Sequence, residues 1–98
     1  SLTMLLSQLA HQDPDFDKKA VFVMGLLQRK PYHDMLALIP NHIPIRLVDF
    51  QPGSSVGPHN TLPRPVTFMD RHHPDLLTGP FVVITGSIYF LGALKSIT

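Results

Sequence analysis

Apolar residues recur at helical spacing near the start of the chain. Between Leu2 and Leu9 they occupy positions 2, 5, 6 and 9, which is the pattern of one face of an α-helix. The next segment, HQDPDFD, has an aspartate on each side of Pro14, and this composition favours a turn. We therefore expect a helix that starts at Leu2 and ends before His11.

Two continuously apolar runs predict buried strands. AVFVMG spans 20–25 and FVVIT spans 81–85, and short runs of this kind are typical of strands covered on both faces. IPIRLVDF, at 43–50, predicts a further strand, and PVTFMD, at 65–70, predicts a weak short one. The segment 51–65 between them is dense in Pro, Gly and Ser, so we expect a long loop there.

Each of the two buried strands leads into a predicted helix. Pro31 suits the first turn of one helix, which continues at helical spacing until Pro40. Gly86 supplies a bend and Ser87 an N-cap for the other helix, IYFLGALKSI, whose apolar stripe predicts a largely buried helix. RHHPDLLTGP, which precedes the last strand, is expected to be a loop with at most one helical turn.

Repeated strand–helix units predict an α/β fold with a mostly parallel sheet and helices on both of its faces. Ligands of such sheets bind beyond the carboxyl ends of the strands. In this chain those ends are expected at residues 25–31 and 85–87. Candidate binding residues should therefore be sought in these two segments.

Both segments offer groups that attract an anion. Arg29 and Lys30 follow the first buried strand and can hold an anionic substrate; alternatively they are a solvated surface pair. The helix start at Gly86 and Ser87 offers backbone amides and a positive dipole end to a carboxylate or phosphate. The alternative for that turn is a simple helix cap.

The bulk composition narrows the classes of function. The 98 residues suffice for one small domain, and 44% apolar with 15% charged residues suits a globular core. The net charge of +1 lacks the basic footprint of a nucleic-acid-binding protein. The chain has no cysteine, which excludes disulfides and cysteine nucleophiles and makes a cytoplasmic location the expectation.

A membrane anchor is not expected. The apolar run from Phe81 to Leu94 is interrupted by Gly, Ser and Thr and is shorter than the roughly 20 residues of a spanning helix. The chain starts at Ser1 without a basic segment before its first apolar residues. We therefore expect that the chain has no signal peptide and that it is cut from a longer sequence.

Three further patterns do not meet the requirements of known sites. GSSVG occurs without the glycine spacing or the Gly-Lys-Ser/Thr of nucleotide-binding loops. His72 and His73, with Asp70 and Asp75, match no zinc spacing, so we expect a polar loop and no metal site. A Ser-His-Asp hydrolase would need a Gly-x-Ser-x-Gly elbow that the chain lacks, and a small hydrolase using Ser87 is kept only as a third alternative.

Two longer motifs, TGSIYFLGALKSI and VFVMGLLQRKPYHDMLALI, carry a family resemblance. The first is similar to Thr-Gly-Ser-Leu-Tyr-Leu-Val-Gly at the C-terminus of the bacterial bifunctional dihydrofolate synthase / folylpolyglutamate synthase family. The second resembles that family's strand, glycine, Asp-Lys-Asp and Met-Leu helix. The residues that match are Thr85, Gly86, Ser87, Tyr89, Leu91 and Gly92 in the first motif, and Gly25, Lys30, Met35 and Leu36 in the second. A strand like IRLVDF and a loop with HNTLP lie between the motifs, so the resemblance covers most of the chain.

The resemblance implies a Rossmann-like C-terminal domain of a Mur-type ligase, with residues 1–98 forming a single truncated domain that lacks its first strand. Such enzymes use ATP and magnesium to activate a carboxylate as an acyl phosphate, which the nitrogen of glutamate attacks to form an amide; the acceptor is dihydropteroate or a folate. The implied partners are the missing N-terminal ATP-binding domain, glutamate and folate-type substrates, with no nucleic acid and no membrane. Lys30 is expected to contact an anionic group, and Arg29, Gly86 and Ser87 to line the same crevice.

The chain departs from the family pattern in ways that limit what it can do alone. Arg29, Lys30 and Pro31 stand where the family has Asp-Lys-Asp, so both carboxylates are lost. The Asp-Gly-Ala-His-Asn-Pro motif, the P-loop and the magnesium ligands are absent from the chain, and ATP and magnesium are expected to bind mainly outside it. We therefore expect the chain alone to be inactive, and the resemblance does not distinguish addition of the first glutamate from extension of a glutamate tail.

A second hypothesis is a free-standing, noncatalytic α/β binding module. The lost carboxylates fit this hypothesis as well as they fit a ligase fragment. Loss of the first strand would also leave an unpaired sheet edge and exposed apolar surface, which predicts that the chain associates with itself or is poorly soluble.

Overall fold

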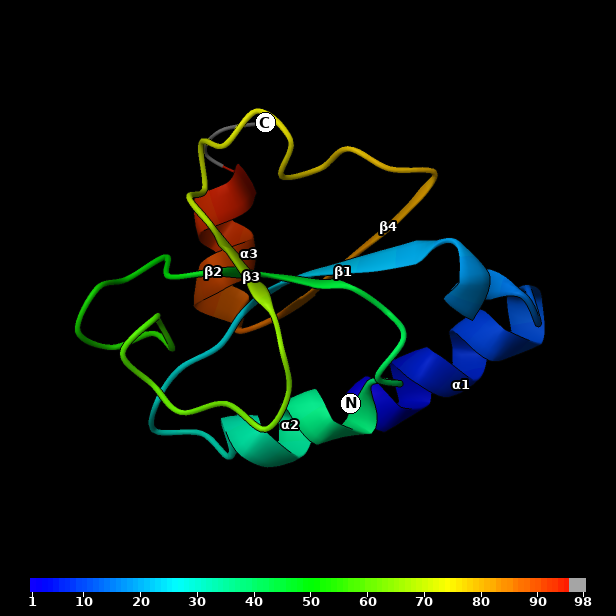
Figure 1. Cartoon of the computed structure of the whole chain (residues 1–98), viewed down its shortest axis with the longest axis horizontal. Coiled ribbons are helices and arrows are strands. Elements are labelled where there is room, and N and C mark those ends of the chain that lie inside the picture. The colour runs from blue at the N-terminus through cyan, green and yellow to red at the C-terminus, as the bar shows by residue number, and fades with distance from the viewer. Residues whose placement is uncertain (96–98) are drawn as a thin grey trace.

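Four parallel strands form the centre of the computed structural model, which describes residues 1–95 (Figure 1). The strands follow the order β3-β2-β1-β4 across the sheet, and each neighbouring pair is parallel. Their bounds are Ala20–Gly25 for β1, Ile45–Val48 for β2, Thr67–Met69 for β3 and Phe81–Gly86 for β4. The predicted α/β architecture is confirmed, and the sheet is parallel throughout the described residues.

Helices cover both faces of the sheet. The bounds are Leu2–Gln12 for α1, Phe16–Lys18 for the short 3-10 helix η1, Tyr32–Leu38 for α2 and Ile88–Lys95 for α3. Figure 1 shows α1 and α2 on one side of the sheet and α3 on the other. This is the arrangement that the repeated strand–helix pattern predicts.

β1 is the buried strand between the two sets of helices. All six of its residues are buried, as expected for a continuous apolar run. Successive side chains alternate between the faces: Phe22 and Met24 belong to the core under α1 and α2, whereas Val23 packs with Phe90 and Leu94 of α3. The sheet thus separates a larger core from a smaller one.

The first predicted helix forms and is longer than expected. α1 continues through His11 to Gln12, and the side chain of Ser1 caps it by accepting a hydrogen bond from the amide of Met4. The expected turn follows, where the amide of Asp15 donates to the carboxylate of Asp13 at 3.0 Å. The prediction ended the helix two residues too early. Polar residues such as His and Gln can continue a helix whose apolar face already packs on the core.

α3 is much less buried than the sequence predicts. Phe90 and Leu94 are buried, but Ile88 is 76% exposed, Tyr89 62% and Leu91 41%. The prediction of a largely buried helix is therefore wrong. One stripe of the helix packs on the sheet, and the remaining apolar side chains have no described element beyond them. The last residues of that expected helix, 96 and 97, lie outside the described residues.

The loop before β3 contains buried residues that its composition does not predict. Ser55 and Val56, inside the proline- and glycine-rich loop, are buried. Arg64 is only 9% exposed, and its guanidinium donates hydrogen bonds of 2.6 to 3.3 Å to the carbonyl oxygens of four residues after α2, namely Ile39, Pro40, Asn41 and Ile43. Arg64 therefore ties the loop before β3 to the loop before β2.

One remaining segment agrees with its prediction. RHHPDLLTGP forms hydrogen-bonded turns and no helix. Within residues 1–95, the helices are all too short or too polar to span a lipid bilayer.

Candidate functional site

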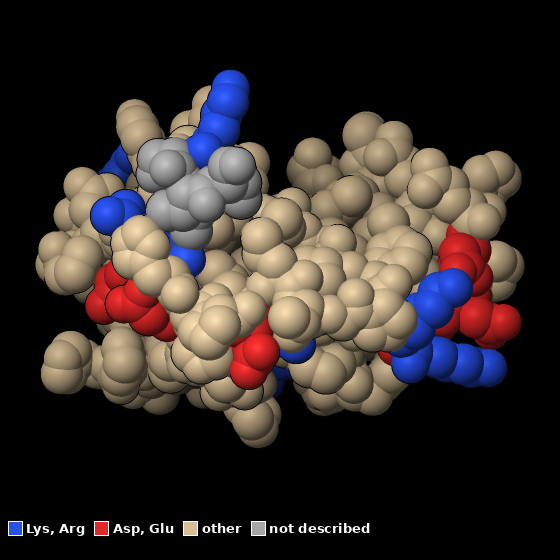
Figure 2. Space-filling model, turned by 90° about the horizontal axis from the view of Figure 1, so that it is seen from above, with Lys and Arg blue, Asp and Glu red and all other residues tan. Residues whose placement is uncertain are grey.

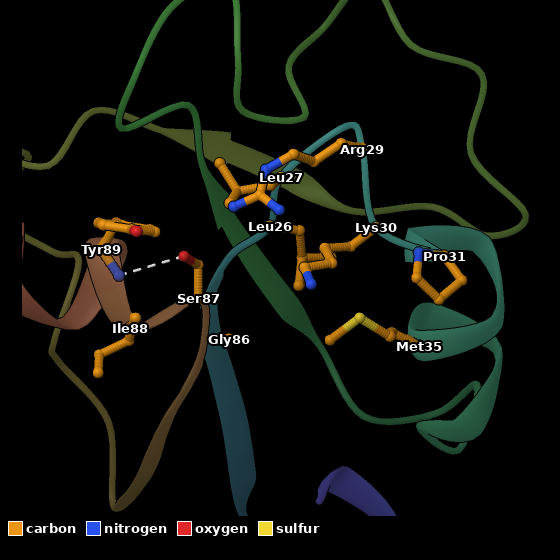
Figure 3. A pocket seen from close by; sticks show the side chains of 10 residues that line it. All are labelled: Leu26, Leu27, Arg29, Lys30, Pro31, Met35, Gly86, Ser87, Ile88 and Tyr89. Atoms are coloured by element: carbon orange, nitrogen blue, oxygen red, sulfur yellow. Dashed lines mark hydrogen bonds between the residues drawn. The ribbon is translucent and has the colours of Figure 1, made fainter.

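A pocket of about 330 Å³ lies beyond the carboxyl ends of β1 and β4. The turn after β1, the start of α2 and the turn between β4 and α3 enclose it (Figure 3). Its lining residues are Leu26, Leu27, Arg29, Lys30, Pro31, Met35, Gly86, Ser87, Ile88 and Tyr89. The two segments that the sequence analysis singled out are therefore adjacent in space.

Gly86 allows the ends of β1 and β4 to approach each other at the pocket wall. Gly25 and Gly86 face each other at the end of the β1–β4 register. Gly86 has a φ of 121°, which side chains disfavour, and a Cβ added there would overlap the carbonyl of Gly25. The amide of Ser87 then donates to that same carbonyl oxygen at 2.8 Å. The glycine in the TGS motif is thus required by the backbone, whatever the ligand.

Ser87 caps the helix that borders the pocket. Its hydroxyl accepts a hydrogen bond from the amide of Tyr89 at 3.1 Å (Figure 3), and its carbonyl accepts from the amide of Leu91 at 3.1 Å. The predicted N-cap is confirmed. The positive end of the helix dipole consequently lies at the pocket wall.

Arg29 and Lys30 supply the positive charge of the site. The backbone of Lys30 is fixed by hydrogen bonds, since its amide donates to Leu27 at 3.1 Å and its carbonyl accepts from Tyr32 at 2.7 Å. Figure 3 shows both side chains extending from the turn after β1 toward the middle of the pocket. Within residues 1–95, neither side chain forms an ion pair or a hydrogen bond. Both charges are available to a ligand.

The loop after β2 supports the turn that carries these cations. Leu27 and Ser55 form an antiparallel bridge, and the amide of Gln28 donates to Ser54 at 2.9 Å. The buried hydroxyl of Ser55 donates in turn to the carboxylate of Asp49, directly after β2. Arg29 therefore lies on a turn that hydrogen bonds to the loop after β2 hold in place.

The remaining pocket wall is apolar. Leu26, Leu27, Met35 and Ile88 contribute aliphatic or thioether surface. No His, Asp or Glu is among the lining residues, so none of these three bases lines the pocket together with Ser87. The arrangement suits a small ligand with anionic groups and an aliphatic body.

A smaller cavity of about 220 Å³ adjoins the first. It is lined by Leu27, Arg29, Gln51, Ser54 and Tyr89. Leu27, Arg29 and Tyr89 line both cavities. A ligand longer than the first pocket could therefore continue past Arg29 toward the polar side chains of Gln51 and Ser54.

The histidine-rich segment forms turns. The amide of His72 donates to the carboxylate of Asp70 at 2.7 Å, and the amide of Asp75 donates to Nδ1 of His73 at 3.0 Å. Across residues 1–95, no cluster of three or more His, Cys, Asp or Glu side chains is placed to hold a metal ion. These polar side chains stabilise the loop before β4.

The fold and the pocket define the class of protein. It is an α/β protein with a parallel sheet and a ligand-sized pocket at the carboxyl ends of two neighbouring strands. Comparison with protein-family models, with curated proteins and with solved structures finds no match for this chain. The family resemblance of its motifs accordingly stays a prediction.

The structure brings all four predicted site residues together. Lys30, Arg29, Gly86 and Ser87 line one pocket, although their roles toward a ligand stay predictions. The sequence analysis did not predict which apolar residues line the pocket. Met35 could have been predicted, because a helix that begins at the pocket directs the side chain one turn later back toward it. Nothing in the sequence marks Leu26 and Leu27 as lining residues.

Proposed function

We propose that this chain binds glutamate in the pocket between β1 and β4, as the C-terminal part of an ATP-dependent amide ligase of the folate pathway. The observation that carries the proposal is the placement of Arg29 and Lys30, both unpaired within residues 1–95, on the same pocket as the Ser87 turn. Two cations match the two carboxylates of glutamate, and the aliphatic wall matches its methylene groups. The motif resemblance supports the same ligand.

The chain's own part in the reaction is to bind and orient. Lys30 and Arg29 hold the carboxylates, the start of α3 adds its dipole, and the apolar wall excludes water from the ligand. ATP and magnesium would supply carboxylate activation in the complete enzyme. Residues 1–95 offer neither a phosphate-binding loop nor a metal cluster, so no activation step is assigned to them. The proposed location of the enzyme is the cytoplasm.

A noncatalytic binding module is the second candidate. It is favoured by one observation, namely that Arg29 and Pro31 stand in the pocket wall where the resembled family has aspartates. Such a module would hold the same anion with no chemistry. Both candidate functions therefore place the anion in the same pocket. They differ in whether the rest of the polypeptide supplies an ATP-binding domain.

Titration calorimetry with L-glutamate tests the pocket. We expect saturable binding, weaker binding of L-glutamine because it lacks one carboxylate, and a loss of affinity of about ten-fold or more in Arg29→Ala or Lys30→Ala. Lys18→Ala, which removes an exposed cation of η1 paired with Asp15, should leave the affinity unchanged. Equal binding of glutamate and glutamine would contradict the assignment.

The intact mass of the endogenous protein separates the two candidates. A species several-fold heavier than the 10.9 kDa of this chain, with ATP-dependent glutamate ligation, is expected for the ligase. A species of 10.9 kDa that binds glutamate would exclude the ligase and support the noncatalytic binding module.

A further inference from the structure

β4 is a long, open edge of the sheet. It has six residues and pairs with β1 on one side only, because it is the last strand in the order β3-β2-β1-β4. Within residues 1–95, no strand or bridge occupies its outer side. Its outward amide and carbonyl groups are a template for another strand.

The opposite edge is better protected than β4. β3 has only three residues, Pro65 precedes it by two positions, and Asp70 and Arg71 follow it. Short length, proline and charge are the devices by which sheets avoid pairing at an edge. Pro80 directly precedes β4, but the strand itself has six residues and contains no proline and no charged residue, so pairing is resisted less at this edge than at the edge formed by β3.

The surface beside β4 is apolar and uncharged. Ile84 is 42% exposed and points to the α3 side, because Val82 packs in the core on that side and side chains alternate along a strand. On the same side of the sheet, Ile88 and Leu91 of α3 are also exposed. Residues 76–94 contain no Lys, Arg, Asp or Glu. Figure 2, which views this side, shows most of the charged groups toward the two ends and one acidic group with basic atoms beside it in the lower middle, with uncharged surface around them.

We propose that two copies of this chain pair antiparallel through β4, edge to edge, and join their sheets into one. The two-fold axis is perpendicular to the sheet, so both copies of α3 lie on the same side. The inference does not depend on what the pocket binds.

A second copy fits this edge for two reasons. An uncharged surface complements another uncharged surface, and a charged partner would find no opposite charge over residues 76–94. A two-fold axis also places the same patch on both partners, so each exposed Ile84 is covered by the apolar surface of the other copy. The unpaired backbone groups of both strands are satisfied in the same step.

Sedimentation equilibrium of the chain tests the proposal. We expect twice the 10.9 kDa chain mass at micromolar concentration, and a dissociation constant raised about ten-fold or more in Ile84→Lys, since edge lysines oppose strand pairing. Leu38→Lys is the matched control, because Leu38 of α2 is 48% exposed on the opposite side of the sheet. This variant should dimerise with the wild-type dissociation constant. A wild-type monomer at high micromolar concentration overturns the proposal and leaves the edge to a different protein or to a strand from the rest of the longer polypeptide proposed above.

Cysteine cross-linking tests the geometry independently of Ile84→Lys. The chain has no cysteine, so Ile84→Cys introduces a single thiol. Antiparallel pairing with the two-fold axis at residue 84, the register proposed here, places the two copies of this position opposite each other and close enough for a disulfide. We expect oxidation to give a covalent dimer with Ile84→Cys and not with Leu38→Cys. Equal cross-linking of the two variants, or a dimer that withstands Ile84→Lys with its circular dichroism unchanged, also overturns the proposal.

Discussion

The amide of Ser87 donates a 2.8 Å hydrogen bond to the carbonyl oxygen of Gly25. This bond joins the turn after β4 directly to the end of β1, from which the segment with Arg29 and Lys30 continues. The two halves of the pocket wall, distant in sequence, are thereby held in fixed relation. Substitutions at this junction should alter the stability of the fold and the shape of the pocket together.

Gly86→Ala should destabilise the protein. The residue has a φ of 121°, and a Cβ would overlap the Gly25 carbonyl, so we expect a loss of about 1–3 kcal/mol in the free energy of unfolding. Urea denaturation followed by circular dichroism measures it. Gly92→Ala is the control, because nothing lies within 4 Å of a Cβ there, and alanine in the α3 helix should stabilise by about 0.5–1 kcal/mol. Equal effects of the two substitutions would contradict the argument.

Ser87 should separate helix capping from ligand binding. Ser87→Ala removes the acceptor for the Tyr89 amide and should cost about 0.5–2 kcal/mol of stability. Ser87→Asp keeps a capping oxygen and should retain most of that stability. Its negative charge lines the pocket, however, and should weaken glutamate binding about ten-fold or more. Thermal unfolding and calorimetry on both variants check this, and tight glutamate binding by Ser87→Asp would argue against an anion at this wall.

Arg64 should be among the most sensitive positions outside the pocket. Burial lowers the pKa of its guanidinium, yet four carbonyl oxygens still accept hydrogen bonds from it. Arg64→Met leaves those carbonyls without their donor and should cost about 2–4 kcal/mol. Arg71→Met, at an exposed position in the loop before β4, should change stability by no more than about 0.5 kcal/mol. Urea denaturation of both variants compares them, and a tolerated Arg64→Met would show that the clamp is dispensable.

Asp13 should contribute to the acid sensitivity of the fold. A 2.6 Å ion pair with Lys19 and a hydrogen bond from the Asp15 amide lower the pKa of its carboxyl below the usual 3.8. A carboxyl whose pKa is lowered by folding stabilises the native state above its ordinary pKa, and this contribution disappears as the pH falls through the lowered value. Wild type should thus melt at a higher temperature than Asp13→Asn near pH 7, and the difference should close below about pH 4.

A second aspartate serves as the control for that pH series. The side chain of Asp75 has no hydrogen bond or ion pair within residues 1–95. Asp75→Asn should follow the wild-type melting temperature across the same range. A melting difference for Asp13→Asn that persists unchanged at pH 2.5 would rule out the ion pair as its origin.

The strands and the location of the pocket were predictable, and the reasons are local. AVFVMG and FVVIT are apolar without interruption because both of their faces are covered, and the glycine and serine after the second run mark a turn that only a few residues can adopt. A parallel sheet then determines that Lys30 and Ser87 lie at the same edge.

The features that were missed depend on contacts between distant segments. The burial of Ser55 and Val56 results from their bonds to Leu27 and Leu26, which composition cannot reveal in a loop rich in Pro and Gly. Arg64 has the sequence appearance of a surface cation. The exposure of α3 was mispredicted because helical periodicity identifies an apolar stripe but not whether the sheet extends far enough to cover it.

The position of β1 between β2 and β4 has a consequence for the order of folding. Ala20 faces Phe81 in the register, so one whole side of the innermost strand gains its neighbour only after most of the chain has been synthesised. Pairing over such a separation is slow relative to local structure formation. Until β4 arrives, β1 presents a bare apolar edge, and the emerging polypeptide should depend on a chaperone more than its small size suggests.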